Sequence, residues 1–399
     1  MSSADHTPKT PPLFRPLITA LSKLKVGAIS VTLPGGQRFD FVGTEPGPKA
    51  DLVIRSPRLI KRMLMGGTLG LAEGYMAGDW TSKDVMTLIR VGEMNRSILG
   101  PLDQGGRLMR ALQWCVHVFR ANTKRGSRKN IQAHYDLGND FYRLWLDPSM
   151  TYSSAIFHEP DQDLHSAQIN KYDAILEILK PTDASHILEI GSGWGGFAQR
   201  AAQQTGCRVT SITLSQAQLE KAQARTQQAG LSDQVTFKLQ DYRDVRGQYD
   251  AIASIEMFEA VGEQFWPGFF AAVHDRLHPH GIAAMQVITI RDELFAAYRK
   301  SVDFIQRYIF PGGMLPSPTA FKQSAESAGL ELKSQVFRGL DYAKTLAFWD
   351  EAFQNKREDV KALGFDDRFI RMWHFYLAYC EAGFRQKTID LMQVGLRRA

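Results

Sequence analysis

A short glycine-rich segment near the middle of the chain has the residue types and spacing of a ligand-binding turn. Residues 187–190 read as a buried strand, and Gly191, Gly193 and Gly196 follow directly before a helical pattern. Glycines at such positions let the backbone approach a ligand closely, and the first N–H groups of the helix face that ligand. An acid, Glu189, precedes the first glycine by two residues. The segment therefore predicts a site for a nucleotide-like ligand.

Two ligands fit this glycine spacing, a dinucleotide and S-adenosylmethionine (SAM). A dinucleotide fold has an Asp or Glu about 20 residues further on, at the end of the next strand, where it binds the ribose. The next strand here, residues 209–215, ends without an acid. We therefore favour SAM, and an NAD-dependent dehydrogenase is the least favoured alternative.

Further short strings follow one another in a fixed order, and together they are more specific than the glycine turn. They are LAEGYMAG at 71–78, HYDLGNDFY at 134–142, TYSSA at 151–155, TLSQAQ at 213–218, MFEAVG at 257–262, YIFPGG at 308–313 and DYAKTL at 341–346. In this order they resemble the cyclopropane-fatty-acyl-phospholipid synthase family of SAM-dependent fatty-acid methyltransferases. The resemblance covers nearly the whole chain and is densest between about residues 130 and 390.

The resemblance implies which residues bind SAM. They lie at strand ends and in the turns that follow, where ligands of open α/β sheets bind. The implied residues are Tyr152 and Ser153 at the sulfonium end, Glu189 before the turn, Gly191 and Gly193 against the methionine part, Thr213, Leu214 and Gln218 at the ribose, and Tyr242, Arg243 and Ile255 around the adenine.

The resemblance also implies a base. In this family a glutamate that matches Glu259 helps to hold a bicarbonate ion, and a tyrosine that matches Tyr342 contacts the same ion. The chain departs from the family pattern at Ser154 and Gln286, where Cys and His typically line the bicarbonate site. Ser and Gln still hydrogen-bond anions, so we expect the site to persist in altered form. Cys380 matches a cysteine sometimes regarded as active, and the alternative is a packed helix cysteine.

The implied reaction needs positioning and a strong electrophile, because an isolated C=C is a weak nucleophile. Alignment of the SAM methyl with the alkene in a dry pocket lowers the barrier. Methyl transfer leaves a carbocation on the acyl chain, which aromatic faces and a nearby anion stabilise. Loss of a proton from the new methyl closes a cyclopropane, whereas loss from a chain carbon gives a methylated alkene. The two departures at Ser154 and Gln286 leave the choice between these products open.

Positive charge is concentrated in one stretch. Between Arg107 and Lys129 there are seven basic residues and no acidic one, and apolar residues recur there at helical spacing. A helix with one apolar face and a basic remainder binds anionic membrane surfaces. The alternatives are a helix packed on its own domain followed by a solvated basic linker, and a nucleic-acid surface, for which no motif is present.

The bulk composition is that of an ordinary globular enzyme. The 399 residues carry a net charge of +6 and are 44% apolar. The three cysteines show no zinc or disulfide spacing, the start is polar, and no apolar run is long enough to span a bilayer. We expect a cytoplasmic protein, peripherally associated with the inner face of the membrane, with no metal site.

Alternating strand and helix patterns predict the fold class. Strands at 187–190, 207–214, 235–239, 251–255 and 282–288 alternate with helices, which predicts a parallel sheet covered on both faces. We expect an α/β, Rossmann-like SAM-dependent methyltransferase domain at 131–399 with a helical, aromatic-rich C-terminal part. A small α+β domain at 1–122, with a hairpin at 28–42, engages lipid or membrane, and 123–130 is a linker.

We therefore expect an enzyme that transfers a methyl(ene) group from SAM to the double bond of an unsaturated phospholipid acyl chain. The expected product is a cyclopropane, and a methyl-branched or methylene fatty acid is the first alternative. A methyltransferase for a soluble small molecule and a non-catalytic lipid-binding protein are the others. The expected partners are unsaturated phospholipid and an anionic membrane surface, without nucleic acid; a homodimer stays open.

Overall fold

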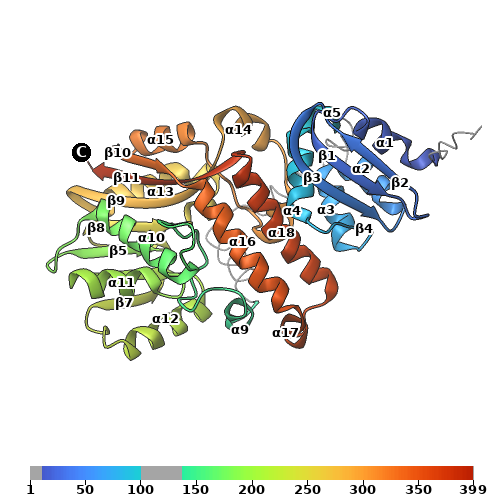
Figure 1. Ribbon diagram of the computed structural model, residues 1–399. Helices are drawn as coiled ribbons and strands as arrows, with labels where there is room; N and C mark the ends of the chain where they lie inside the picture. Colours follow the sequence, from blue (N-terminus) through green and yellow to red (C-terminus); the bar gives the residue numbers. More distant parts are fainter. Residues whose placement is uncertain (1–10, 100–136, 399) are drawn as a thin grey trace, which may run out of the picture. The chain divides into compact units, whose positions relative to one another are not determined.

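Two compact units make up the part of the chain that the computed structural model describes, residues 11–99 and 137–398 (Figure 1). Of the described residues, one unit contains 11–99 and Gly364–Gln386, and the other contains 137–363 and 387–398. The basic stretch, the linker predicted at 123–130 and His134 lie outside the described residues.

The N-terminal unit is built on a four-stranded sheet in the order β2-β1-β3-β4. β1 and β2 pair antiparallel from Ala28–Val42 to Thr32–Arg38, so the predicted hairpin is confirmed, and β3 runs parallel to β1. The strands are β1 (Val26–Thr32), β2 (Arg38–Val42), β3 (Glu45–Ile54) and β4 (Trp80–Thr81). The helices are η1 (Pro12–Phe14), α1 (Arg15–Leu21), α2 (Arg58–Gly66), α3 (Thr68–Met76), α4 (Val85–Met94) and α5 (Arg96–Leu99).

The long helix α18 (Asp367–Arg385) packs in this N-terminal unit, against α3 and α4. The ring of Phe375 lies 5.9 Å from that of Tyr75 and 6.5 Å from that of Trp80. The Arg371 guanidinium lies 5.7 Å from the Tyr75 ring centroid. We expected residues 364–386 to belong to the methyltransferase domain at 131–399. In the structure their aromatic side chains instead pack against Tyr75 and Trp80 of the N-terminal unit.

The second unit contains a seven-stranded sheet in the order β10-β11-β9-β8-β5-β6-β7. Strands β5 to β9 are mutually parallel where they pair, whereas β11 pairs antiparallel with both β9 and β10. The strands are β5 (His186–Ile190), β6 (Arg208–Thr213), β7 (Val235–Leu239), β8 (Tyr249–Ile255), β9 (Leu277–Ile290), β10 (Leu330–Phe337) and β11 (Ile389–Arg398). The predicted α/β methyltransferase-like sheet is confirmed.

Helices cover both faces of this sheet, each over its own apolar core. One core joins α10, α11 and α12 to the sheet through side chains such as Ile175, Phe197 and Ala222, and the other joins α13 and α15 through Phe270 and Phe321. These helices are α10 (Leu164–Leu179), α11 (Gly196–Thr205), α12 (Gln216–Gln228), α13 (Trp266–Arg276) and α15 (Pro318–Ser327). The remaining ones are α9 (Asn139–Arg143), η2 (Tyr242–Asp244), η3 (Phe258–Ala260), η4 (Glu263–Phe265), α14 (Asp292–Tyr298), the π-helix η5 (Ile305–Ile309), α16 (Gly339–Asn355) and α17 (Arg357–Ala362).

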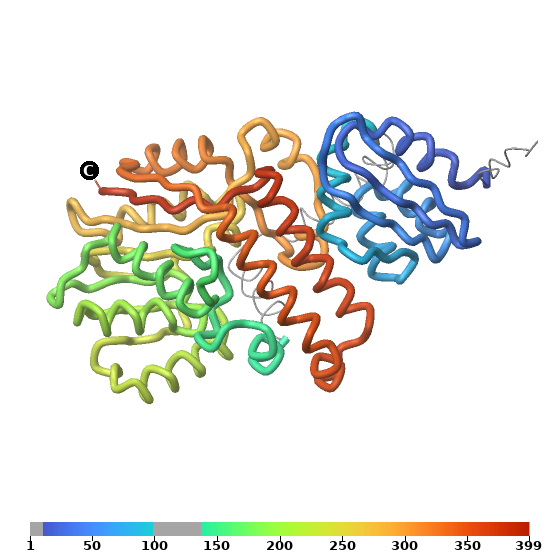
Figure 2. Tube along the Cα trace, in the orientation of Figure 1, coloured from blue at the N-terminus to red at the C-terminus, as the bar shows by residue number. Residues whose placement is uncertain are grey.

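The chain ends in a strand where we predicted only helix. Figure 2 shows the red C-terminal segment, β11, running between β10 and β9. Its residues from Leu391 to Leu396 are all buried, because β11 is an inner strand and both faces of the sheet are covered there. Helix prediction after residue 346 is confirmed for α16, α17 and α18 but is wrong for β11, because its pairing partners are distant in sequence. No helix in residues 11–99 or 137–398 has the length and apolarity to cross a membrane.

Candidate active site

The glycine turn between β5 and α11 lies at the carboxyl end of the sheet, as predicted. Gly191, Gly193 and Gly195 have φ angles of 101°, 47° and 87°, in the left-handed region that glycine adopts without strain. A Cβ on Gly195 would lie 2.9 Å from the Phe237 ring, so that glycine allows α11 to pack closely. A Cβ on Gly193 meets nothing within 4 Å. Gly193 therefore faces open space, where a ligand fits against the backbone.

Glu189 is buried in β5 and bonds to the neighbouring strand. The Ser211 hydroxyl donates a 2.5 Å hydrogen bond to its carboxylate, and the side chain is 2% exposed. Burial raises the pKa of Glu189 to about 8, against the Ser211 hydrogen bond and the Lys171 charge that lower it. Glu189 is thus a largely protonated acid at neutral pH.

The turn after β6 holds the residues predicted for the ribose. The Thr213 hydroxyl donates a 2.9 Å hydrogen bond to Gln218 Oε1, and the Ser215 N–H donates to the Thr213 hydroxyl oxygen. The Ser215 hydroxyl caps α12 by accepting from the Gln218 N–H. Leu214 lies between them and is partly buried. These hydrogen bonds hold the Gln218 side chain at the end of β6. The neutral Thr213–Gln218 pair thus lies where a dinucleotide-binding fold has an acidic residue.

The residues predicted around the adenine follow the next two strands. Tyr242 and Arg243 lie in η2, after β7, and Ile255 ends β8. Arg243 forms a two-point ion pair with Asp241, with N–O distances of 2.8 and 2.6 Å, and lies 5.4 Å from the Tyr242 ring centroid. Tyr242 packs edge-on against Phe269. Tyr242, Arg243 and Ile255 are all partly buried at the same edge of the sheet as the glycine turn.

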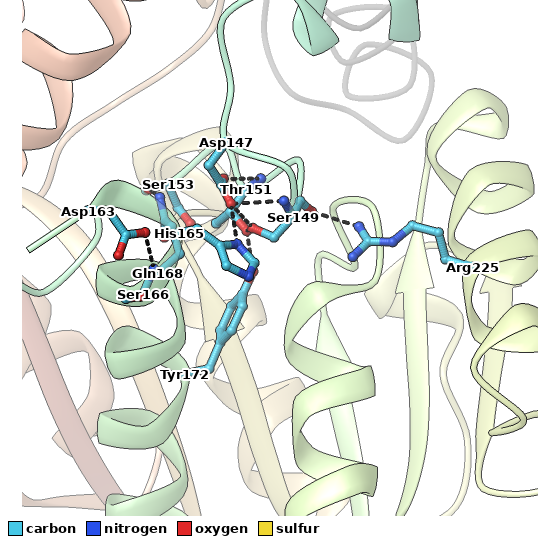
Figure 3. Close-up of polar contacts among 10 residues, drawn as sticks. All are labelled: Asp147, Ser149, Thr151, Ser153, Asp163, His165, Ser166, Gln168, Tyr172 and Arg225. Atoms are coloured by element: carbon cyan, nitrogen blue, oxygen red, sulfur yellow. Dashed lines mark hydrogen bonds and ion pairs between the residues drawn. The ribbon is translucent and has the colours of Figure 1, made fainter.

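A dense polar network fixes the loop that carries Tyr152 and Ser153 (Figure 3). Asp147 accepts hydrogen bonds from the Ser149 N–H, at 2.8 Å, and from the Thr151 N–H, at 3.2 Å. The Thr151 hydroxyl bonds to the Tyr172 hydroxyl in α10 at 2.8 Å, and Gln168 Nε2 donates to the Ser153 carbonyl at 2.8 Å. These bonds position the loop from two sides, so Tyr152 and Ser153 are held before any ligand binds.

A buried lysine lies beneath the same loop. Lys171, on α10, is fully buried and donates a 2.6 Å hydrogen bond to the Ser153 hydroxyl oxygen. Burial lowers the pKa of Lys171 to about 7, while the charges of Glu256, Asp147 and Glu189 raise it. Lys171 is therefore a buried amine whose charge is sensitive to pH near neutrality. We did not predict its position here, because a single Lys in a helical pattern gives no signal of burial in the sequence.

An aromatic cluster adjoins the loop. Five rings lie with neighbouring centroids between 5.1 and 5.8 Å apart, and they are Tyr142, Trp145, Tyr152, Trp194 and Trp349. Tyr342 lies edge-on to Trp349, 6.1 Å away, on the same helix α16. We call these six residues the aromatic cluster. Apolar faces of this kind exclude water and stabilise cations.

The carboxylate that collects hydrogen bonds at this site is Glu256, which sequence reasoning missed. The Ser154 N–H and Gln286 Nε2 each donate to Oε1 at 2.8 Å, and the Tyr342 hydroxyl donates to Oε2 at 2.6 Å. Gln286 Oε1 in turn accepts from Gln393 Nε2 at 2.8 Å, which fixes the amide orientation. The available signal was an acid directly after the β8 strand, next to the MFEAVG string.

Glu259, which we predicted to be the catalytic acid, is three residues from Glu256 but has different hydrogen-bond partners. One of its carboxylate oxygens accepts from the Ile288 N–H, and the other is buried with no hydrogen-bond partner among the described residues. Burial, followed by the charge of Glu256, raises the pKa of Glu259 to about 8. The two carboxyl groups thus have different environments, with three hydrogen-bond donors on Glu256 and an unpaired oxygen on Glu259 among the described residues.

The bicarbonate ion expected from the family pattern does not fit this arrangement. Ser154, Gln286 and Tyr342, three of the groups expected at the ion, all donate to the Glu256 carboxylate. The Ser154 hydroxyl, which we expected to face the anion, donates to the Ala155 carbonyl instead. A second anion there would lie beside two carboxyl groups and lack these donors.

Cys380 belongs to a different unit from these residues. It is partly buried on α18, which packs in the N-terminal unit. The other predicted site residues all belong to the second unit. The structure thus brings the predicted SAM-binding residues and Glu259, Ser154, Gln286 and Tyr342 to one end of one sheet.

SAM fits the residues present at the strand ends. The open cradle over Gly193 admits a ligand against backbone N–H groups, and the Thr213–Gln218 pair offers polar contacts for hydroxyl groups. The held Tyr152–Ser153 loop closes the side that leads to the aromatic cluster.

Comparison with known proteins agrees with this geometry. The family model described as mycolic acid cyclopropane synthetase matches residues 122–394. The tuberculostearic acid methyltransferase UfaA1 of Mycobacterium tuberculosis is 38% identical over 369 residues, 89% of this chain and 84% of that one. The Escherichia coli cyclopropane-fatty-acyl-phospholipid synthase is 36% identical over 354 residues, 88% of each chain.

Solved structures give the same result for the second unit. The cyclopropane synthase MmaA2 of Mycobacterium tuberculosis has a TM-score of 0.64 at 31% identity, covering 68% of this chain and 98% of that one. The mycolic acid cyclopropane synthase CmaA1, complexed with SAH and CTAB, has a TM-score of 0.64 at 32% identity, with the same coverage. The chain therefore belongs to the mycolic acid cyclopropane synthetase family and is a SAM-dependent methyltransferase.

Proposed function

We propose that this methyltransferase transfers a methyl group from SAM to the double bond of an unsaturated acyl chain in a phospholipid, and that loss of a proton then closes a cyclopropane. The observation that carries the proposal is the joining of three parts at one strand-end site. The Tyr152–Ser153 loop, the aromatic cluster and the Glu256 carboxylate are linked by direct contacts. The names of the relatives, which include fatty-acid methyltransferases and a phospholipid cyclopropane synthase, support lipid as the substrate.

Each part has a separate task in the reaction. SAM supplies an electrophilic methyl group on a sulfonium, and the residues at Gly191, Gly193, Thr213 and Gln218 hold it in place. The aromatic cluster excludes water and faces the acyl chain, so the alkene is the best nucleophile present. The C–S electron pair leaves with sulfur, the alkene pair forms the new C–C bond, and positive charge develops on the acyl chain.

Aromatic rings and a carboxylate would stabilise this positive charge on the acyl chain. Aromatic faces attract cations by about 0.5–2 kcal/mol each when desolvated. The ionised carboxylate at the edge of the cluster adds a fixed negative charge in a water-poor site, where its effect is larger than in bulk water. Under this proposal the same carboxylate accepts the proton whose loss forms the product.

A methyl-branched or methylene product is the second candidate, and one observation favours it. Ser154 and Gln286 stand where the family typically has Cys and His, and both contact Glu256. A proton acceptor in a different position selects a different C–H bond. Under this candidate, Ser154→Cys with Gln286→His shifts the product ratio toward cyclopropane.

The test uses SAM with a deuterated methyl group and vesicles of unsaturated phospholipid, followed by mass spectrometry of the acyl chains. A cyclopropane keeps two deuteriums and an alkene deprotonated at a chain carbon keeps three. A methylene product keeps two as well, and a parallel reaction with unlabelled SAM separates it from the ring by its olefinic proton signals in NMR. Label in a soluble small molecule but not in lipid, or no transfer from bound SAM, would disprove the proposal.

We also propose that the protein associates peripherally with anionic membrane. The seven basic residues between Arg107 and Lys129 support this, because acyl chains in a bilayer are reached only from its surface. Attraction of such residues to anionic lipid contributes about 1 kcal/mol each near the surface.

A further inference from the structure

The hydrogen-bond donors at the proposed proton-transfer site already have an acceptor in the protein, the Glu256 carboxylate. A backbone N–H, a glutamine amide and a tyrosine hydroxyl converge on the two oxygens of Glu256 at 2.6–2.8 Å. Two of the donors, Ser154 and Gln286, are completely buried, so they lack water as an alternative partner. Such a cradle is what a bound oxyanion requires, and here the chain supplies the oxyanion itself.

We propose that Glu256 is the base of the reaction, and that this enzyme therefore turns over without bicarbonate. The inference rests on the proposed function, since it concerns the proton lost after methyl transfer. It accounts for the departure at Gln286, whose side-chain amide contacts the Glu256 carboxylate, whereas the Ser154 contact is a backbone N–H that any residue at position 154 donates. Ser154 and Gln286 are the residues that hold the Glu256 carboxylate, the first through its N–H and the second through its amide.

The step balances with the groups present. After methyl transfer the acyl chain is a carbocation, and a C–H bond next to the cationic carbon or on the new methyl breaks. Its electron pair forms the ring bond or the new C=C, and the proton goes to a Glu256 carboxylate oxygen. Glu256 returns this proton to water before the next turnover, so no further reactant is needed.

The surroundings of Glu256 hold more groups that favour an ionised carboxylate than those of Glu259 do. Burial raises the pKa of Glu256, but hydrogen bonds from Tyr342, Ser154 and Gln286 and the Lys171 charge all lower it. Glu259 receives one backbone hydrogen bond and is raised further by the Glu256 charge, with a pKa of about 8. Of the two carboxyl groups, Glu256 is thus the one whose hydrogen-bond donors favour the carboxylate that a base requires.

The backbone conformation of Glu256 also supports a functional role for this residue. Its φ angle is 49°, a left-handed conformation that costs a non-glycine residue roughly 1–2 kcal/mol. The Glu256 N–H donates to the Gln286 carbonyl at 2.8 Å, which holds this conformation at the end of β8. Strain of this kind persists at functional sites, where the position of a side chain matters more than local stability.

The experiment compares the wild type with two variants, in buffer freed of carbon dioxide and in buffer with added bicarbonate or formate. Glu256→Gln keeps the side-chain shape and the hydrogen-bond acceptor but removes the base. Glu256→Gly suits the positive φ and opens a space in which a small oxyanion meets the same donors. Glu326→Gln, on an exposed helix face, is the matched control for loss of one carboxylate.

We expect wild-type turnover to be unchanged by bicarbonate, and Glu256→Gln to lose at least ~100-fold, the scale of a lost general base. Glu256→Gly should be equally slow in carbon-dioxide-free buffer and recover at least ~10-fold with saturable bicarbonate or formate, a rescue that a structural role does not produce. SAM affinity, measured by calorimetry, should stay within a few-fold for both variants.

Two results would overturn the inference while leaving the proposed function intact: bicarbonate-dependent turnover of the wild type, or near-wild-type turnover of Glu256→Gln. Absence of rescue in a folded, SAM-binding Glu256→Gly also counts against it. A wild type that transfers no methyl group to phospholipid disproves the proposed function instead, so the two failures are distinguishable.

Discussion

Replacement of Gly193 by alanine separates the space left for SAM from ordinary backbone strain. Both Gly193, with φ of 47°, and Gly230, with φ of 68° after α12, are left-handed, and a Cβ at either meets nothing within 4 Å. Alanine in this region costs about 1–2 kcal/mol. For a unit of this size we expect each variant to melt about 2–8 °C lower. Gly230→Ala is therefore a control matched in conformation, free space and chemistry.

Only Gly193→Ala should affect the ligand, because only its new methyl group points into the proposed cradle. We expect SAM affinity to fall at least ~10-fold, which is about 1.4 kcal/mol, in calorimetric titration. In a melting experiment at ~100 times the wild-type Kd, stabilisation by SAM should drop from about 2.7 to about 1.4 kcal/mol. Gly230→Ala should keep the full stabilisation. Equal SAM affinity in the two folded variants would refute the assignment of the cradle.

Two further predictions concern pH and salt. The pKa of Glu189 is raised from 4.5 to about 8, so its protonated form stabilises the fold below pH 4.5 and this contribution, roughly 3–5 kcal/mol, is lost as pH rises toward 8. Glu189→Gln should thus flatten the fall of the melting temperature between pH 5 and 7, and an unchanged slope would contradict the burial argument. Vesicle binding should require anionic lipid and weaken as salt screens exposed charge beyond about 10 Å at 0.1 M. Binding that ignores both lipid charge and salt would show that residues 107–129 are only a linker.

Local sequence was sufficient for the features that depend on local chain geometry. The Gly191 to Gly196 turn and the β5 to β8 strands were predicted because a strand and a glycine turn each leave a short-range signal. Since carboxyl ends of parallel strands share one edge of a sheet, the clustering of the residues that follow them was predictable as well.

Tertiary structure alone decided which of the two acids receives the converging hydrogen bonds. Glu256 and Glu259 are three residues apart, and nothing local distinguishes them. The difference arises because Gln286 on β9 and Tyr342 on α16 donate to Glu256, while the Ile288 N–H donates to Glu259. Parallel pairing of Ile255 with Gln286 sets this register across 31 positions in the chain.

The final strand and the packing of α18 were likewise outside the reach of sequence patterns. β11 is a strand because β9 and β10 lie on either side of it, and its apolar run would serve a buried helix equally well. The aromatic face of α18 predicted burial, but the partner rings at Tyr75 and Trp80 are about 300 residues earlier. Sequence thus determined which surfaces must be buried and where a ligand turn forms, whereas the long-range contacts of the fold decided which surfaces meet and which carboxylate collects hydrogen-bond donors.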